Sequence, residues 1–207
     1  MEKLKNQVWA QIFIIYTRYL IGGTFVFASL IKIKGLRFTS ESGAENPINS
    51  AWHFFETLYQ SGLYWKFIGL GQLIAGFLLM TQRYSKLGAL INLPIILNIF
   101  IITLSFDFGY TPVVTGFMLL ANILLLLWDW NVLKVLFNRM PTFDGTVRLE
   151  QHRIWEIIGL MLFAVTFFYR MLINKYQLFH WFLACTAVGL LGLFVGFRLF
   201  KKQQQSI

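Results

Sequence analysis

Six long apolar runs, separated by short breaks that contain charged residues, Gly or Pro, dominate this sequence. Each run is close to the roughly 20 residues that a helix needs to cross the hydrocarbon core of a bilayer. The apolar positions are continuous rather than alternating, which favours helices over the strands of a β-barrel. The pattern therefore predicts an all-α integral membrane protein with six transmembrane helices, at residues 8–31, 63–80, 87–106, 113–130, 154–173 and 178–200.

The connection after the first run is long and contains a further amphipathic segment. Between residues 48 and 60, apolar side chains recur at helical spacing, and polar side chains occupy the other side. We expect an interfacial helix at 48–60 that lies on the outer leaflet or covers the mouth of the bundle, with its aromatic face buried. The apolar positions are Ile48, Trp52, Phe55 and Tyr59, and the polar ones are His53, Glu56, Thr57 and Gln60.

A second polar connection, at residues 131–153, divides the first four runs from the last two. We therefore predict a four-helix bundle at 1–139, followed at 140–207 by a loop and a C-terminal helical hairpin. Within the bundle, small and polar residues recur on one face of each helix, which favours close helix packing. These residues are Gln11, Arg18, Gly22 and Ser29 in the first run, Gly62, Gly69, Gln72 and Gly76 in the second, and Thr115, Asn122 and Asp129 in the fourth.

Composition and charge support a membrane location. The 207 residues are 57% hydrophobic, with a mean hydropathy of +0.62, too apolar for a soluble domain. The net charge of +9 is explained by topology and by anionic membrane lipids, so we do not expect a nucleic-acid partner. Lys and Arg are more frequent in the termini and in the second and fourth connections, which predicts cytoplasmic termini, and we expect no cleavage after the first run.

Two segments of the sequence carry a family resemblance. The first is RYLIGGTFVFASLIK, with Arg18, Gly22, Phe25 and Lys32, and the second is GQLIAGFLLMTQRYSKLGALINL after the outer loop. Together they resemble the DoxX family of bacterial four-helix membrane proteins. The resemblance covers roughly residues 10–135, and the last two runs lie outside it. Ser29 stands where a glycine is expected, and Gln72 stands where many members carry glutamate. The resemblance implies a bundle in the bacterial inner membrane, in some cases a small subunit of a quinone-linked oxidoreductase.

Arg18 is the most informative single residue, because an arginine in a lipid-facing helix costs at least ~3 kcal/mol and should therefore face inward to a partner. By helical rise, Arg18, Gln72, Asn98 and Asn122 all fall near the middle of their runs, which makes them the candidate ligand-binding cluster. Three partners for Arg18 remain open: amides and backbone carbonyls, Asp129 nearer the cytoplasmic side, or a ligand. A guanidinium and amides are suited to hold the carbonyl head of a quinone or lipid.

Cofactor chemistry has little support in the sequence. A single cysteine, Cys185, excludes an internal disulfide and a Cys-based cluster within this chain, and we find no haem, Fe–S or flavin motif. His53, Glu56, His180 and Asp107 fall on the predicted outer side, but their spacing is not that of a metal site, so they are weak candidates. We expect no catalytic residues.

These features lead to one preferred function and two alternatives. The chain is expected to be a non-catalytic accessory subunit of a larger membrane assembly, with a membrane protein partner and a quinone- or lipid-binding pocket. The first alternative is a membrane subunit of a quinone-linked oxidoreductase. The second is a carrier or sensor for a small lipophile.

Overall fold

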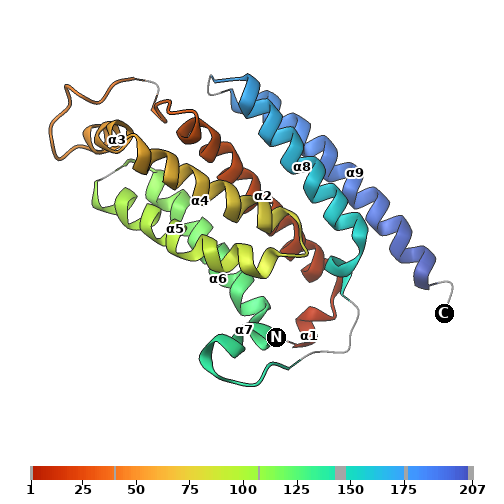
Figure 1. Ribbon diagram of the computed structural model, residues 1–207. Coiled ribbons are helices and arrows are strands. Elements are labelled where there is room, and N and C mark those ends of the chain that lie inside the picture. The colour runs from red at the N-terminus through yellow and green to blue at the C-terminus, as the bar shows by residue number, and fades with distance from the viewer. Residues whose placement is uncertain (1, 40, 107, 143–147, 175–176, 205–207) are drawn as a thin grey trace.

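The computed structural model describes residues 2–39, 41–106, 108–142, 148–174 and 177–204, and the regular structure within them is entirely helical (Figure 1). Six helices are long and apolar enough to cross a membrane, which confirms the predicted all-α membrane fold. The elements are α1 (Glu2–Lys5), α2 (Val8–Ile33), α3 (Ala51–Gln60), α4 (Leu63–Met80), α5 (Ser85–Ser105), α6 (Thr111–Trp128), α7 (Trp130–Leu133), η1 (Lys134–Phe137), η2 (Leu149–Gln151), α8 (Arg153–Leu172) and α9 (Leu178–Gln204).

Helix α2 is the central element of the molecule. It packs against α4 on one side and against α8 on the other. In its most apolar 18-residue stretch 78% of the residues are buried, compared with 11% in the corresponding stretch of α9. One apolar core lies between α2, α4, α5 and α6, around Phe25 and Leu125. A second core lies between α2, α4 and the hairpin of α8 and α9, around Tyr19 and Trp155. The hairpin therefore rests alongside α2 (Figure 1).

Glycines bring α2, α4 and α8 close enough for backbones to touch. A Cβ on Gly76 would lie 2.7 Å from the carbonyl oxygen of Gly22, and a Cβ on Gly22 would lie 2.8 Å from that of Gly76. A Cβ on Gly159 of α8 would collide with the Met80 carbonyl oxygen. Close approach of this kind maximises packing between helices in lipid, where apolar burial supplies no driving force.

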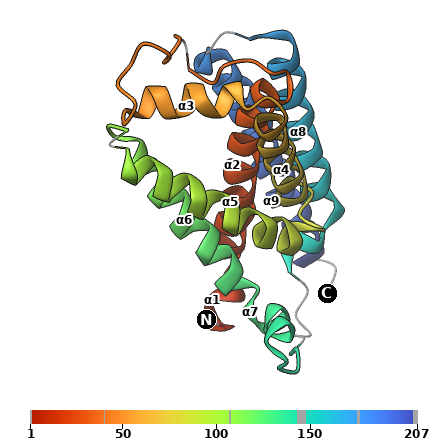
Figure 2. The same cartoon turned by 60° about the vertical axis from the view of Figure 1, so that its left-hand side comes forward.

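The two ends of the bundle differ. Both termini lie at one end, together with α1 and α7, and α3 lies across the opposite end (Figure 2). We call these the terminal end and the α3 end. The position of both termini at one end is what an even number of spans requires.

Helix α3 begins at Ala51, where the Ser50 hydroxyl accepts a hydrogen bond from the His53 amide. Its rings pack over the connection between α5 and α6: Phe54 stacks on Phe106, with centroids 4.5 Å apart, and Phe55 contacts Phe108 at 5.1 Å. The predicted interfacial segment is thus a helix that covers the bundle, although it begins three residues later.

The predicted faces of this helix were wrong at two positions. Glu56 is only 2% exposed, whereas Trp52, on the predicted buried face, is 42% exposed. The burial of Glu56 is explained by Arg37, which donates to the Glu56 carboxylate from Nε at 2.9 Å and from Nη2 at 2.8 Å.

Candidate functional site

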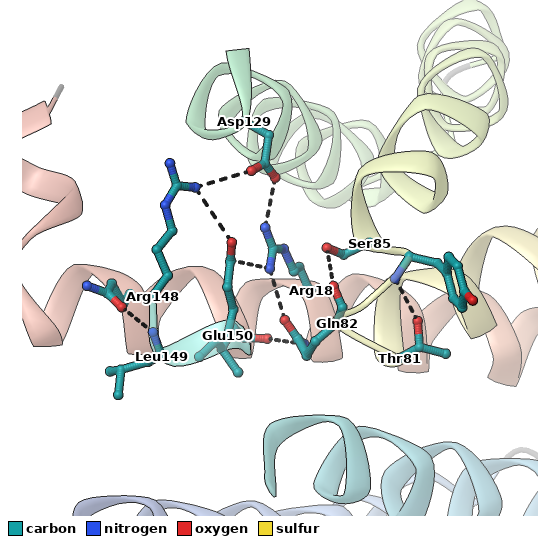
Figure 3. A network of polar contacts seen from close by, with 11 residues as sticks. Arg18, Thr81, Gln82, Ser85, Asp129, Arg148, Leu149 and Glu150 are labelled. Carbon is teal, nitrogen blue, oxygen red and sulfur yellow. Dashed lines mark hydrogen bonds and ion pairs between the residues drawn. The ribbon is translucent and has the colours of Figure 1, made fainter. Parts of the chain in front are cut away.

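Arg18 lies at the centre of a buried polar cluster that joins four separate segments (Figure 3). The side chain is 1% exposed. Its Nη2 donates to Asp129 Oδ2 at 2.8 Å, and its Nη1 donates to Glu150 Oε2 at 2.5 Å. The same Nη1 donates to Gln82 Oε1 at 3.0 Å. Arginine thus connects α2 with the α4–α5 turn, the end of α6 and the segment before α8.

The α4–α5 turn is shaped to present Gln82. Gln82 has a positive φ of 58°, and the hydroxyls on either side fix the turn: Thr81 Oγ1 accepts from the Tyr84 amide, and Ser85 Oγ donates to the Gln82 carbonyl. The Gln82 amide nitrogen donates to the Ile15 carbonyl at 3.3 Å, so its oxygen is the atom that faces Arg18.

Asp129 and Glu150 lie near the two ends of the long connection between α6 and α8. Asp129 is the C-terminal cap of α6, where its carbonyl accepts from the amides of Val132 and Leu133 and starts α7. Glu150 is in η2, and the neighbouring Leu149 amide donates to Gln11 Oε1 at 2.7 Å. These backbone anchors hold both carboxylates in place before α8 begins.

The charges of the cluster cancel. Arg148 lies 3.5 Å from Asp129 and 3.6 Å from Glu150, so two guanidinium groups face two carboxylates. Burial raises the pKa of Glu150, but the Arg18 guanidinium, assisted by Arg148, lowers it by more, and the net pKa is below the ordinary value. An ion pair with this many hydrogen bonds is the form in which charges are tolerated away from water. Both carboxylates are thus engaged in ion pairs that join separate segments of the chain.

The four residues predicted to form a ligand site are not brought together. Arg18 bonds to none of Gln72, Asn98 and Asn122, because its side chain reaches toward the terminal end. Two of the kinds of partner left open for Arg18 are present, the Asp129 carboxylate and a side-chain amide. The amide that Arg18 contacts is that of Gln82, which the sequence reasoning did not select.

Each of the other three predicted residues has its own environment. Asn122 is fully buried: its Oδ1 accepts from Asn92 at 2.9 Å and its Nδ2 donates to the Ala89 carbonyl. Gln72 is 3% exposed, and its Oε1 has no hydrogen-bond partner. Asn98 is exposed on the outer face of α5, so its assignment to an inward cluster was wrong.

Asn92 was not predicted from the sequence. It shares a helix face with two small residues, Gly88 and Ala89, which lie four and three positions before it. These two are also buried. That spacing was a usable signal, because small residues mark the packed face of a transmembrane helix. For Glu150 no such signal exists, since it lies in a connection outside the apolar runs.

The α3 end does not assemble the weak metal candidates. Glu56 is occupied by Arg37, and His180 is exposed at the start of α9. His53 is half-buried, with Nδ1 unbonded, and Asp107 lies outside the described residues. No group of three or more His, Cys, Asp or Glu that could hold a metal ion occurs in the described part of the chain.

A second set of contacts attaches the hairpin at the α3 end. Lys34 Nζ donates to the carbonyls of Arg170 and Met171, at 2.8 and 2.6 Å, and to Asn174 Oδ1 at 3.0 Å. The lysine thereby binds the carbonyls that the last turn of α8 leaves without partners.

An open cavity of about 400 Å³ lies near Lys34, and none of the four predicted ligand residues lines it. Its lining consists of Lys34, Gly35, Tyr59, Gln60, Gly62, Trp65 and Lys66.

Comparison with known proteins shows a partial similarity to a bacterial protein. The chain is similar to the uncharacterized protein YwoB of Bacillus subtilis (strain 168), with 40% identity over 102 residues. The aligned region is 49% of this chain and 63% of that protein, so the chain spans less than two thirds of its relative. No family model and no solved structure matches the chain.

Proposed function

We propose that this protein is a non-catalytic, DoxX-like accessory subunit of a larger assembly in the bacterial inner membrane, with both termini in the cytoplasm. The observation that supports this role is the internal neutralisation of Arg18. Its two terminal nitrogens donate to Gln82, Asp129 and Glu150, and its charge is balanced within the cluster. The buried cation, the strongest candidate for gripping a ligand, is thus engaged by the protein itself.

The cluster also fits the mechanical task of an accessory subunit. Glu150 precedes α8 by three residues, so the bond to Arg18 attaches the hairpin at the terminal end, and Lys34 attaches it at the α3 end. A hairpin fixed at both ends presents the outer face of α9 in one orientation. Only 11% of the residues in the most apolar 18-residue stretch of α9 are buried, so its outer face is left for lipid or a partner helix.

A second candidate function is the binding of a quinone or another small lipophile, which would suit a subunit of an oxidoreductase, a carrier or a sensor. One observation favours it: Gln72 Oε1 is buried within the bundle without a donor. An unpaired buried acceptor costs roughly 1–3 kcal/mol, and a hydroxyl donor on a quinol would satisfy it.

Native mass spectrometry of the gently extracted protein distinguishes these functions. The accessory role predicts a stoichiometric protein partner that is retained in both the parent and Gln72→Leu. Lipophile binding predicts a small molecule that copurifies with the parent and is lost from Gln72→Leu. Recovery of the chain with bulk phospholipid alone, in membranes from the native organism, would contradict the accessory role.

A further inference from the structure

Asn98 on α5 is a polar side chain that faces the lipid. It lies seven residues before the end of α5 at Ser105, about 10 Å along the helix axis, and hence inside the hydrocarbon region. It is exposed, and its amide has no hydrogen bond in the described part of the chain. An amide in hydrocarbon without partners is costly, so this position requires a group from outside the chain.

Other polar side chains of the spans either form hydrogen bonds within the chain or are shielded from lipid. The exposed hydroxyls of Thr24 and Ser105 donate to carbonyls of their own helices, to Leu20 and to Ile101, both at 2.8 Å. The remaining amide side chains of the six spans are buried or half-buried, and they are Gln11, Gln72, Asn92 and Asn122. Asn98 therefore differs from both groups.

The residues around Asn98 form a stripe that suits a second helix. Exposed or half-buried positions recur along α5 with alternating steps of four and three residues, which is the a and d pattern of a two-helix seam. Asn98 then occupies an a position, where a polar residue fixes register and favours pairs. The stripe, which we call the α5 seam, consists of Leu87, Ile91, Pro94, Asn98, Ile101 and Ser105.

The seam is also accessible. Helix α5 packs against α4 and α6, and the hairpin of α8 and α9 lies on the other side of the bundle (Figure 1). No charged residue occurs in the seam, so nothing in it selects a partner of complementary charge. The one specific group is an amide, which carries both a donor and an acceptor and is therefore its own complement.

We infer that the α5 seam binds the same seam of a second copy of this chain. Two copies in one membrane share an orientation, so a two-fold axis along the membrane normal brings both Asn98 side chains together at one depth. Each amide then donates to the other, and the interface is closed. This self-association goes beyond the proposed accessory role and does not depend on a different partner protein.

Disulfide crosslinking in native membranes tests the seam. In a Cys185→Ala background, which removes the native thiol, Ile101→Cys places one thiol in the α5 seam. Leu120→Cys places one on the exposed face of α6 as the matched control. Oxidation should give a dimer of this chain with Ile101→Cys and little with Leu120→Cys. Equal yields, or a crosslink from Ile101→Cys to a different protein, would overturn the inference.

A second measurement isolates the amide. Energy transfer between labelled copies diluted in lipid vesicles should show association about 3- to 30-fold weaker for Asn98→Leu than for the parent, as expected for one interhelical polar contact. Asn98→Gln, which keeps a donor and an acceptor, should retain most of the association. The circular dichroism of both variants should match the parent, because Asn98 is exposed and its side chain makes no hydrogen bond to the described part of the bundle. Parent-like association of Asn98→Leu would contradict the pairing.

Discussion

At the scale of single residues, Arg18 offers the sharpest test. Arg18→Ala removes the cation from two carboxylates that are 3% and 12% exposed, and leaves Arg148, at 3.5 Å or more, as the nearest counter-charge. Removing one partner of a buried ion pair costs about 3–5 kcal/mol, so unfolding in detergent should occur at clearly lower temperature or denaturant concentration. Arg139→Ala, at an exposed position, is the matched control and should unfold like the parent. Parent-like stability of Arg18→Ala would show that the cluster contributes nothing.

The sequence allowed half of this site to be predicted. Arg18 had to face inward, because the cost of a charge in lipid follows from composition and position alone. Its partners Asp129 and Glu150 are 111 and 132 positions away in the chain. Their proximity depends on how far each connection turns back over the end of the bundle, which hydrophobic periodicity does not encode.

A second residue-scale prediction concerns Glu56 and pH. The hydrogen bonds from Arg37 lower the pKa of Glu56 to about 2, below the value of about 4.3 in an unfolded chain. A lowered folded pKa stabilises the native contact above pH ~4.3 and loses that contribution as the pH falls towards 2. The Gly43 amide, which donates to Glu56, should lose protection from hydrogen exchange in this window, after correction for intrinsic rates. In Glu56→Gln, protection should already be low at pH 6 and should show no such step.

At the scale of helices, two glycines of α4 provide a matched pair. Gly76→Ala places a methyl group 2.7 Å from the Gly22 carbonyl oxygen, a backbone atom that cannot move aside without separating α2 from α4. Gly71→Ala places one 3.5 Å from the end of the Ile95 side chain, which is ordinary contact. We expect Gly76→Ala to destabilise the protein by about 1–3 kcal/mol and Gly71→Ala to be nearly neutral, measured by chemical unfolding in micelles. Similar effects for both would exclude a special role of the α2–α4 crossing.

The inward face could be predicted from the sequence for some helices and not for others. In α2 and α4, a set of polar and small residues recurs on one side, and the inward prediction for Arg18, Gly22, Gly69, Gln72 and Gly76 agrees with their burial. In helix α5 nearly all other positions are apolar, so the small residues Gly88 and Ala89 are the signal that distinguishes the face of Asn92 from that of Asn98. In α3 the pattern was clear, but an ion pair with Arg37 overrode it at Glu56.

At the scale of the whole molecule, the bias in Lys and Arg predicts orientation. A reporter fused after Ile207 should be active in the cytoplasm, and one inserted at exposed Glu45, in the connection before α3, should be active outside. Activity of both fusions on the same side would contradict an odd number of spans between the two points. An outside C-terminus with a cytoplasmic Glu45 would invert the orientation and leave the fold intact.

Six spans could be predicted within a few residues, because length and hydropathy define them. The placement of α8 and α9 alongside α2 could not, since any exposed helix of the bundle offers an apolar face of similar character. Particular contacts decide it: Gly159 lets α8 approach Met80, and the Tyr19 hydroxyl donates to the Trp155 carbonyl.

The order in which the ribosome makes the Arg18 cluster has a consequence for biogenesis. Glu150 is synthesised 132 residues after Arg18, roughly 7 to 26 seconds later at about 5–20 residues per second. During that interval the Arg18 guanidinium has no Glu150 to pair with, and four spans are synthesised before the connection to α8 appears. The nascent bundle is therefore open to insertion factors until the chain passes Glu150, and a strain that translates this connection slowly should accumulate more of the protein in degradation-prone intermediates.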